Sequence, residues 1–220
     1  MSPRGRPRAF DREHALTQAM FVFWERGYEG ASLAELTEAM GIKPPSLYAA
    51  FGDKEALFRE AIERYQSVYG QHTMRALTEE PTARAAVEAM LRNNACAYVE
   101  PGHPKGCMVV LAATNCTPAN ASVWKFLAAS RDEVRHQIRA RLRRGVEEGD
   151  LAATVDIDAL GALYATVFYG LTLQARDGVD LDSLMTVIDL ALALWPENGG
   201  GAASTVDTAP SAPGLKPVVR

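Results

Sequence analysis

Cysteine is scarce in this chain, with only three residues among 220. Because three is a small and uneven number of cysteines, a fold that depends on several disulfide bonds is excluded, and a reducing, cytoplasmic location is expected. Long apolar runs are also missing: the longest nearly continuous one, residues 107–113, is far too short to cross a bilayer. The arginine-rich start is followed by an amphipathic segment rather than by a signal-peptide core. We therefore expect no membrane partner.

An excess of positive charge is missing as well. The formal net charge is −4, so the molecule is not built to coat nucleic acid or an anionic membrane. The sequence lacks a glycine-rich phosphate loop, a nucleophile elbow and a His-Glu-x-x-His motif, so we expect neither enzymatic activity nor a cofactor. With 48% hydrophobic residues, the chain can bury one substantial core or two small ones.

The clearest pattern that is present begins at Ser32 and predicts two short helices around a glycine turn. Ser32 and Glu35 form a capping box at the start of the first helix, and Gly41 ends it. Pro44 and Pro45 suit the first turn of the second helix, because that turn leaves backbone N–H groups unpaired anyway. This arrangement predicts a helix-turn-helix, whose second helix enters the major groove of DNA.

A basic arm precedes this pattern. Arg4, Arg6 and Arg8 stand among glycine and proline, and such an extended arm can enter the minor groove; an ordinary solvated terminus is the alternative. Residues 1–60 carry eight Lys/Arg and nine Asp/Glu, and eight minus nine leaves −1. The prediction of DNA binding therefore depends on where the charges lie rather than on their sum. So few cations predict a modest salt dependence.

Helical periodicity extends over almost the whole chain and predicts an all-α fold. A short apolar helix is expected at residues 107–115, where a strand is also possible by composition. The other predicted helices span residues 11–27, 54–77, 82–98, 123–148, 156–175 and 181–195. The helix at 123–148 carries six arginines, which we interpret as an outer face that is solvated or pairs with nearby acids rather than a second nucleic-acid site. These are Arg131, Arg135, Arg139, Arg141, Arg143 and Arg144.

The chain divides into four predicted parts. Residues 1–9 form the flexible arm, 10–56 a three-helix DNA-binding domain, 57–196 a larger helical domain and 197–220 a disordered tail. The last two predicted helices are apolar on more than one face, so they must be buried, and pairing with a second copy of the chain would bury them. The residues expected in this dimer interface are Ala162, Ala165, Tyr169, Leu184, Ile188, Ala191, Leu192 and Trp195.

Several segments of the N-terminal part together resemble the TetR family of one-component bacterial transcription regulators. They are Phe23–Gly30, Ser32–Leu36, Gly41-Ile42, Ser46–Tyr48 and Phe51–Phe58. The resemblance implies an all-helical homodimer with an N-terminal DNA-binding domain and a C-terminal domain that binds a small molecule and dimerises. It also implies repression from a palindromic double-stranded DNA operator, relieved by a small-molecule effector of unknown identity.

The resemblance also implies particular DNA contacts. Ser32, Tyr48 and Lys54 correspond to phosphate contacts, and Lys43 begins the segment that faces the groove. The chain departs from many relatives of that family by carrying alanine at positions 49 and 50. We therefore expect few direct contacts between side chains and bases, and a larger contribution of the arm to sequence specificity. The full set of expected DNA contacts is Arg4, Arg6, Arg8, Ser32, Lys43, Pro44, Pro45, Ser46, Tyr48 and Lys54.

An apolar cavity for the effector is expected between the middle helices. The expected lining residues, with Asn115 as a further polar group, are Tyr98, Met108, Leu111, Cys116, Trp124, Leu127, His136, Tyr164 and Phe168. The three cysteines and His103 leave a metal or redox sensor open as an alternative, but no pair has a close chelating spacing, and packing in the core is favoured. No metal is expected. A helical interaction module without DNA binding is the remaining alternative, and it would not explain the arm and the helix-turn-helix together.

Overall fold

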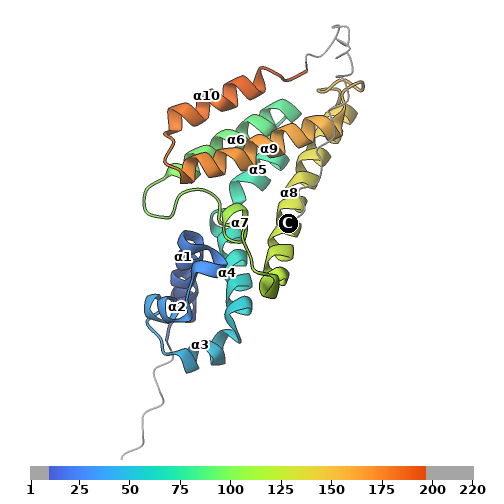
Figure 1. Cartoon of the computed structure of the whole chain (residues 1–220). Helices are drawn as coiled ribbons and strands as arrows, with labels where there is room; N and C mark the ends of the chain where they lie inside the picture. Colours follow the sequence, from blue (N-terminus) through green and yellow to red (C-terminus); the bar gives the residue numbers. More distant parts are fainter. Residues whose placement is uncertain (1–9, 197–220) are drawn as a thin grey trace, which may run out of the picture.

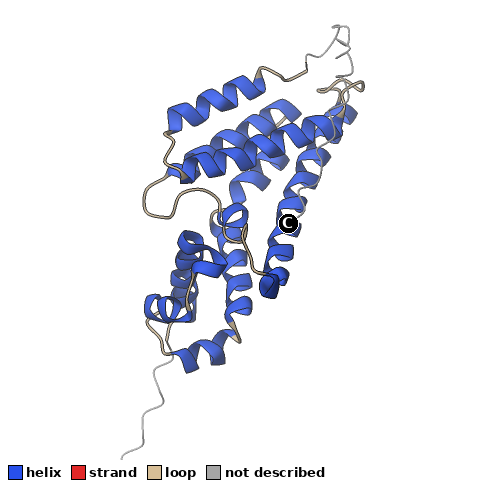
Figure 2. Ribbon diagram, viewed as in Figure 1, coloured by secondary structure: helices blue, strands red, loops and turns tan. Residues whose placement is uncertain are grey.

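The structure is a computed structural model that describes residues 10–196. All regular secondary structure in that range is helical, as predicted (Figure 2). The predicted arm and tail lie outside the described residues. The helices are α1 (Arg12–Gly30), α2 (Leu33–Ala39), α3 (Pro44–Phe51), α4 (Lys54–Val68), α5 (Gln71–Glu79), α6 (Ala83–Val99), α7 (Met108–Leu111), the 3-10 turn η1 (Pro118–Asn120), α8 (Ala121–Glu148), α9 (Ile157–Arg176) and α10 (Leu181–Leu192).

Helices α2 and α3 form the predicted helix-turn-helix. The Ser32 side chain accepts from the Glu35 backbone N–H while Glu35 reaches back, so the capping box is present. Gly41 has a φ of 65°, a left-handed conformation that favours glycine. Leu47 and Phe51 are buried on the inner side of α3, so the opposite side of this helix faces outward.

Helices α1 and α4 hold this pair through a core of aromatic rings. The ring centroids of Phe23 and Phe58 lie 5.0 Å apart at an interplanar angle of 83°, the edge-to-face geometry that aromatic pairs favour. Tyr28 packs on Phe58 with a centroid distance of 5.1 Å. The predicted domain boundary after residue 56 falls inside α4, so one continuous helix connects the two predicted domains.

The helix predicted over residues 54–77 is wrong in one respect, because the chain turns between α4 and α5. Gly70 occupies the turn, and a Cβ there would lie 2.8 Å from the Gln66 backbone oxygen. The backbone N–H groups of Tyr69 and Gly70 both donate to the Tyr65 oxygen, at 2.7 and 3.2 Å, which closes the last turn of α4. The segment predicted as one rod is therefore two helices.

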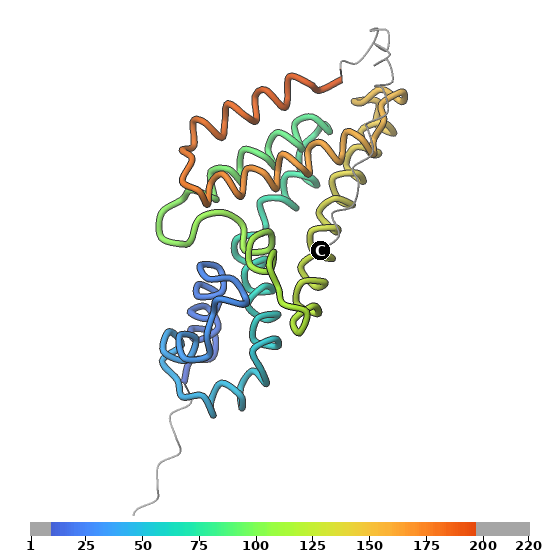
Figure 3. Tube along the Cα trace, in the orientation of Figure 1, coloured from blue at the N-terminus to red at the C-terminus, as the bar shows by residue number. Residues whose placement is uncertain are grey.

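Helices α5, α6, α8, α9 and α10 form the larger part of the molecule, and the short α7 lies between this part and the α1–α4 unit (Figure 1). The tube in Figure 3 shows α4 running from the N-terminal unit toward the larger helical part. Of the helix expected over residues 107–115, only α7 forms, so the helical expectation is confirmed for residues 108–111 and the residues after them form turns. Within residues 10–196, no helix is long and apolar enough to serve as a membrane span.

Arg141 pairs with acids, as the interpretation of the α8 arginines allowed, but it does not lie on an outer face. This side chain is buried, with its two terminal nitrogens 3.8 Å from Glu148 and 3.6 Å from Asp150. Asp150 also accepts from the Ala83 backbone N–H, 3.0 Å away, at the start of α6. Arg141 therefore ties α8 to the turn before α6, and its charge is compensated by carboxylates.

Candidate nucleic-acid interface and effector cavity

The outer side of α3 presents several of the predicted DNA contacts on one surface. Lys43, Pro44 and Pro45 are exposed at its start, and Tyr48 is 49% exposed one turn further on. Ser46 is half-buried beside them. An exposed tyrosine hydroxyl and an exposed lysine are groups that contact the sugar-phosphate backbone of DNA.

Ser32 and Lys54 lie at the starts of α2 and α4. The Ser32 hydroxyl also donates to Glu35, 2.8 Å away, so the exposed side chain predicted to contact phosphate already serves as the cap of α2. The Lys54 ammonium lies 4.5 Å from the centroid of the Tyr28 ring, and burial lowers its pKa. Arg4, Arg6 and Arg8 lie outside the described residues. The DNA contacts therefore stay predictions, with α3 as their centre.

Other cations near this surface are already paired. Arg12 forms an ion pair with Glu60, 2.7 Å apart, and Arg26 lies 3.6 Å from Glu35. Lys43 forms no ion pair within the part of the chain that the structure describes. Lys43 therefore remains available for an anionic partner.

A cavity of about 780 Å³ lies among α4 to α9. Its volume is within the range of about 300–1,000 Å³ that small-molecule sites occupy. Tyr65 and Tyr69 line it from the end of α4, Val109 from α7, Phe126 from α8 and Tyr169 from α9. Burial raises the pKa of Tyr169 to about 12, which keeps its hydroxyl protonated.

Of the lining residues predicted from the sequence, only Phe168 lines this cavity. Trp124 and His136 are exposed on α8 instead, and Leu111 and Cys116 are half-buried outside the lining. Tyr98, Met108, Leu127 and Tyr164 are buried in the core. The sequence pattern gives residues 54–77 as one helix, whereas the turn at Gly70 places the end of α4 and the start of α5 at this cavity. The spacing of Tyr65 and Tyr69, four residues apart, was the available signal. Which residues contact an effector stays a prediction.

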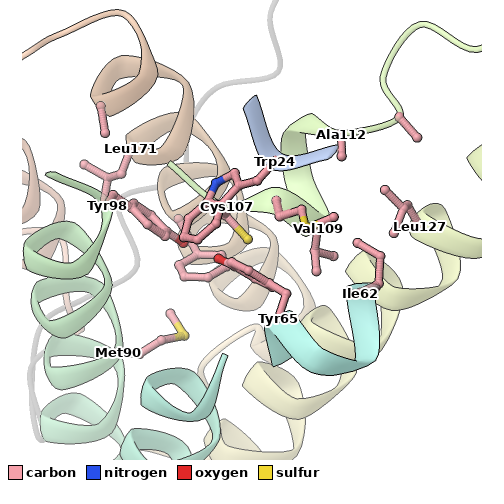
Figure 4. Packing of buried hydrophobic residues seen from close by; sticks show 14 of the residues in the cluster. Trp24, Ile62, Tyr65, Met90, Tyr98, Cys107, Val109, Ala112, Leu127 and Leu171 are labelled. Carbon is pink, nitrogen blue, oxygen red and sulfur yellow. The ribbon is translucent and has the colours of Figure 1, made fainter. Parts of the chain in front are cut away.

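Cys107 also lines the cavity and is enclosed by aromatic side chains. Trp24, Tyr65 and Tyr98 gather around it (Figure 4). Burial raises the pKa of the Cys107 thiol, so the reactive thiolate is disfavoured. Among residues 10–196, no three His, Cys, Asp or Glu side chains are placed to hold a metal ion. The geometry thus favours core packing of Cys107 over the sensor alternative.

The segment around α7 contacts the N-terminal unit directly. The Trp24 indole N–H donates to the Gly106 backbone oxygen, 3.0 Å away. The Tyr28 backbone N–H donates to the Ala112 oxygen at 2.7 Å. Glu29 accepts through Oε1 from the Thr117 backbone N–H at 2.7 Å. The cavity and the helix-turn-helix are therefore connected both through α4 and through this segment.

Glu29 provides a test of the contact between α1 and η1. Its hydrogen bonds from Asn120 and Thr117 hold the pKa of this carboxyl below its ordinary value of 4.5. Because the pKa of Glu29 is lowered in the folded protein, the stabilisation that these hydrogen bonds give is fully present above pH 4.5. It is lost as the pH falls through the lowered pKa of the folded protein. In Glu29→Ala, we expect the Thr117 amide to exchange about tenfold faster at neutral pH, measured by hydrogen exchange. An unchanged Thr117 rate would contradict this role, and Glu25→Ala is the matched control.

Leucine side chains are exposed on α9 and at the end of α10, where Leu190 and Leu194 lie four residues apart and form an apolar stripe. Leu173, Leu190 and Leu194 are 53%, 67% and 65% exposed. The predicted interface needs correction, because α10 uses its other face to pack on α6 and α9 within the same chain. Five of the predicted residues are buried in that core and cannot reach a partner: Ala165, Leu184, Ile188, Ala191 and Leu192. Tyr169 lines the cavity, Trp195 packs against Tyr164, and Ala162 is exposed.

A helix-turn-helix with an exposed second helix, joined by one continuous helix to a larger helical part with a cavity, defines a DNA-binding transcriptional regulator. Residues 15–61 match the family model of tetR-family bacterial regulatory proteins, and residues 81–188 match that of tetracyclin repressor-like C-terminal domains. The chain belongs to the TetR family.

Known proteins of this family are similar over most of the chain. The transcriptional repressor ComR of Escherichia coli K12 is 32% identical, over 88% of this chain and 93% of its own. A cysteine-substituted form of the regulator CifR, solved with a 26-bp operator DNA, is 51% identical with a TM-score of 0.84, covering 87% of this chain and all of that one. A putative regulator from Rhodococcus sp. RHA1 is 36% identical over 84% of this chain and 99% of its own, with a TM-score of 0.57.

Proposed function

We propose that this chain is a repressor that binds a palindromic operator as a homodimer and is released by a small molecule in the cavity. The observation that carries the proposal is the position of α4. Its first residue, Lys54, stands beside the helix-turn-helix, and Tyr65 at its other end lines the cavity. A ligand that moves the end of α4 therefore changes the orientation of the DNA-binding unit.

Release of the dimer from DNA requires only a modest difference in free energy. Two α3 helices of a dimer must lie about 34–36 Å apart to enter successive major grooves. A ligand that prefers another spacing weakens DNA binding by the difference in its affinity for the two forms, typically about 1–3 kcal/mol. The similarity to the repressor ComR and to CifR, which was solved on its operator, supports repression as the outcome.

Substitution of the exposed tyrosine of α3 tests the DNA-binding part of the proposal. In Tyr48→Ala, and in a chain lacking residues 1–9, we expect affinity for the DNA flanking the chain's own gene to fall about tenfold or more. The dimer is expected to persist in both. The measurement is fluorescence anisotropy of that DNA, titrated against salt.

Trp124→Ala is a matched control for Tyr48→Ala, because Trp124 is an aromatic residue of similar exposure, 45%, on α8. It should leave DNA affinity unchanged. Full affinity in both Tyr48→Ala and the arm deletion would overturn the assigned contacts. A protein that remains dimeric and binds no DNA at any salt concentration would instead indicate the interaction-module alternative.

A further inference from the structure

One cation of the cavity has no counter-charge. Arg131 lines the cavity from α8 and is half-buried. Across residues 10–196 no Asp or Glu forms an ion pair with it. Its neighbours on the same helix differ: Arg135 pairs with Asp132, and Arg139 with Asp158. A half-buried guanidinium in an apolar cavity is stabilised by an anion, and the described part of the protein supplies none.

The guanidinium of Arg131 is held in place but not saturated. One of its terminal nitrogens donates to the Val109 backbone oxygen at 3.1 Å, and the Tyr169 hydroxyl donates to the backbone oxygen of Arg131. Desolvation lowers the pKa of Arg131 from that of a free arginine, although the side chain stays charged. Most of the five guanidinium N–H donors are unused by the described residues.

We propose that the cavity binds an amphipathic organic monoanion whose acidic group pairs with Arg131 and whose apolar body contacts the aromatic and branched side chains around it. The assignment rests on the proposed function, which makes this cavity the effector site. The apolar part of the lining includes Val110, Phe126, Val134 and Phe168. A neutral ligand of the same shape would fill this lining but leave the guanidinium unpaired.

The other charged lining residues do not provide this recognition. Arg75 and Glu133 both line the cavity but are exposed, so water screens them. Glu133 also accepts a hydrogen bond from the Gln137 amide. One cation and one anion near solvent give no net preference, which leaves Arg131 to select the charge of the ligand.

The position of Arg131 also couples the anion to the DNA-binding unit. Arg131 bonds to Val109 in α7, and three residues further on, Ala112 accepts from the Tyr28 backbone N–H of α1. An anion bound at Arg131 therefore acts on the short helix that contacts α1. The segment around α7 therefore couples the charge of the ligand to the release of DNA.

Two fluorescent dyes test the proposal on the intact protein. 8-Anilinonaphthalene-1-sulfonate and N-phenyl-1-naphthylamine share one aromatic skeleton, and only the first carries an anionic group. In Arg131→Met, we expect the affinity for the sulfonate to fall about tenfold or more, while the affinity for the neutral dye stays within about threefold. Retained binding of the neutral dye also shows that the variant is folded. In Arg131→Lys, which keeps the positive charge, the affinity for the sulfonate is expected to fall less than in Arg131→Met.

Arg135→Met is the matched control, because Arg135 is an exposed, paired arginine one turn along α8. It should change neither affinity. Three results would overturn the anion assignment: an equal loss of affinity for both dyes in Arg131→Met, no loss of affinity for the sulfonate in that variant, or no dye binding to the wild type. The proposed function fails separately, when the unliganded wild type binds no operator DNA in the anisotropy measurement.

Discussion

A chain carrying both Leu190→Asp and Leu194→Asp is expected to be monomeric and to bind operator DNA about 100-fold or more weakly than the wild type. Leu190 of α10 and Leu194 just after it form an exposed apolar stripe, and we infer that this stripe is part of the dimer interface. In a symmetric dimer the same stripe meets its own copy, so two substitutions bring four carboxylates together. Their burial without partners opposes association.

The loss of DNA affinity follows from the loss of the second DNA-binding unit. A dimer engages two half-sites at once, and this linkage can raise affinity by about 10²–10⁴ over a single unit. Sedimentation measures the oligomeric state, circular dichroism checks the helical fold, and anisotropy measures operator binding. Val68→Asp, at a half-exposed valine of α4, is the control and should remain dimeric. A double variant that still sediments as a dimer would place the interface elsewhere.

The helix-turn-helix could be predicted from the sequence because its signals are local. A capping box at Ser32, a glycine at the turn and two prolines at the start of α3 each act within one helical turn. Leu47 and Phe51 lie four residues apart, on one face of α3, and both are buried. Short-range geometry of this kind does not depend on the rest of the fold.

The cavity and the apolar stripe could not be predicted in the same way, because they depend on long-range packing. The cavity arises where the turn at Gly70 lets α5 pack beside α8, and no pattern within either helix contains that contact. For α10, periodicity shows that several faces are apolar, but only the packing on α6 and α9 decides that Leu190 is left outside and Ile188 is buried. The cavity was therefore missed through a wrong helix boundary and the packing that follows from it, and the stripe through the choice of the face that α10 buries.

Gly106→Ala is expected to lower the free energy of unfolding by about 2–5 kcal/mol, which corresponds to a melting temperature about 4–20 °C lower for a chain of this size. Gly106 has a φ of 77°, and a Cβ there would lie 2.8 Å from the Thr172 backbone oxygen and 2.9 Å from a methyl group of Leu111. A left-handed conformation alone costs a residue with a side chain about 1–2 kcal/mol. The remainder comes from displacing α9 or α7 to make room.

Gly102→Ala separates these two contributions, because Gly102 also has a positive φ, 101°, but nothing lies within 4 Å of the position of its Cβ. Chemical denaturation of both variants should show the larger loss at Gly106, and equal losses would contradict the steric argument. The oxygen of Gly106 accepts the indole N–H of Trp24, and its own N–H donates to Tyr98. A shift of this residue therefore reaches α1 and α6 together, so the Gly106 variant should also bind operator DNA more weakly than the Gly102 variant when both are compared at a temperature where each remains folded.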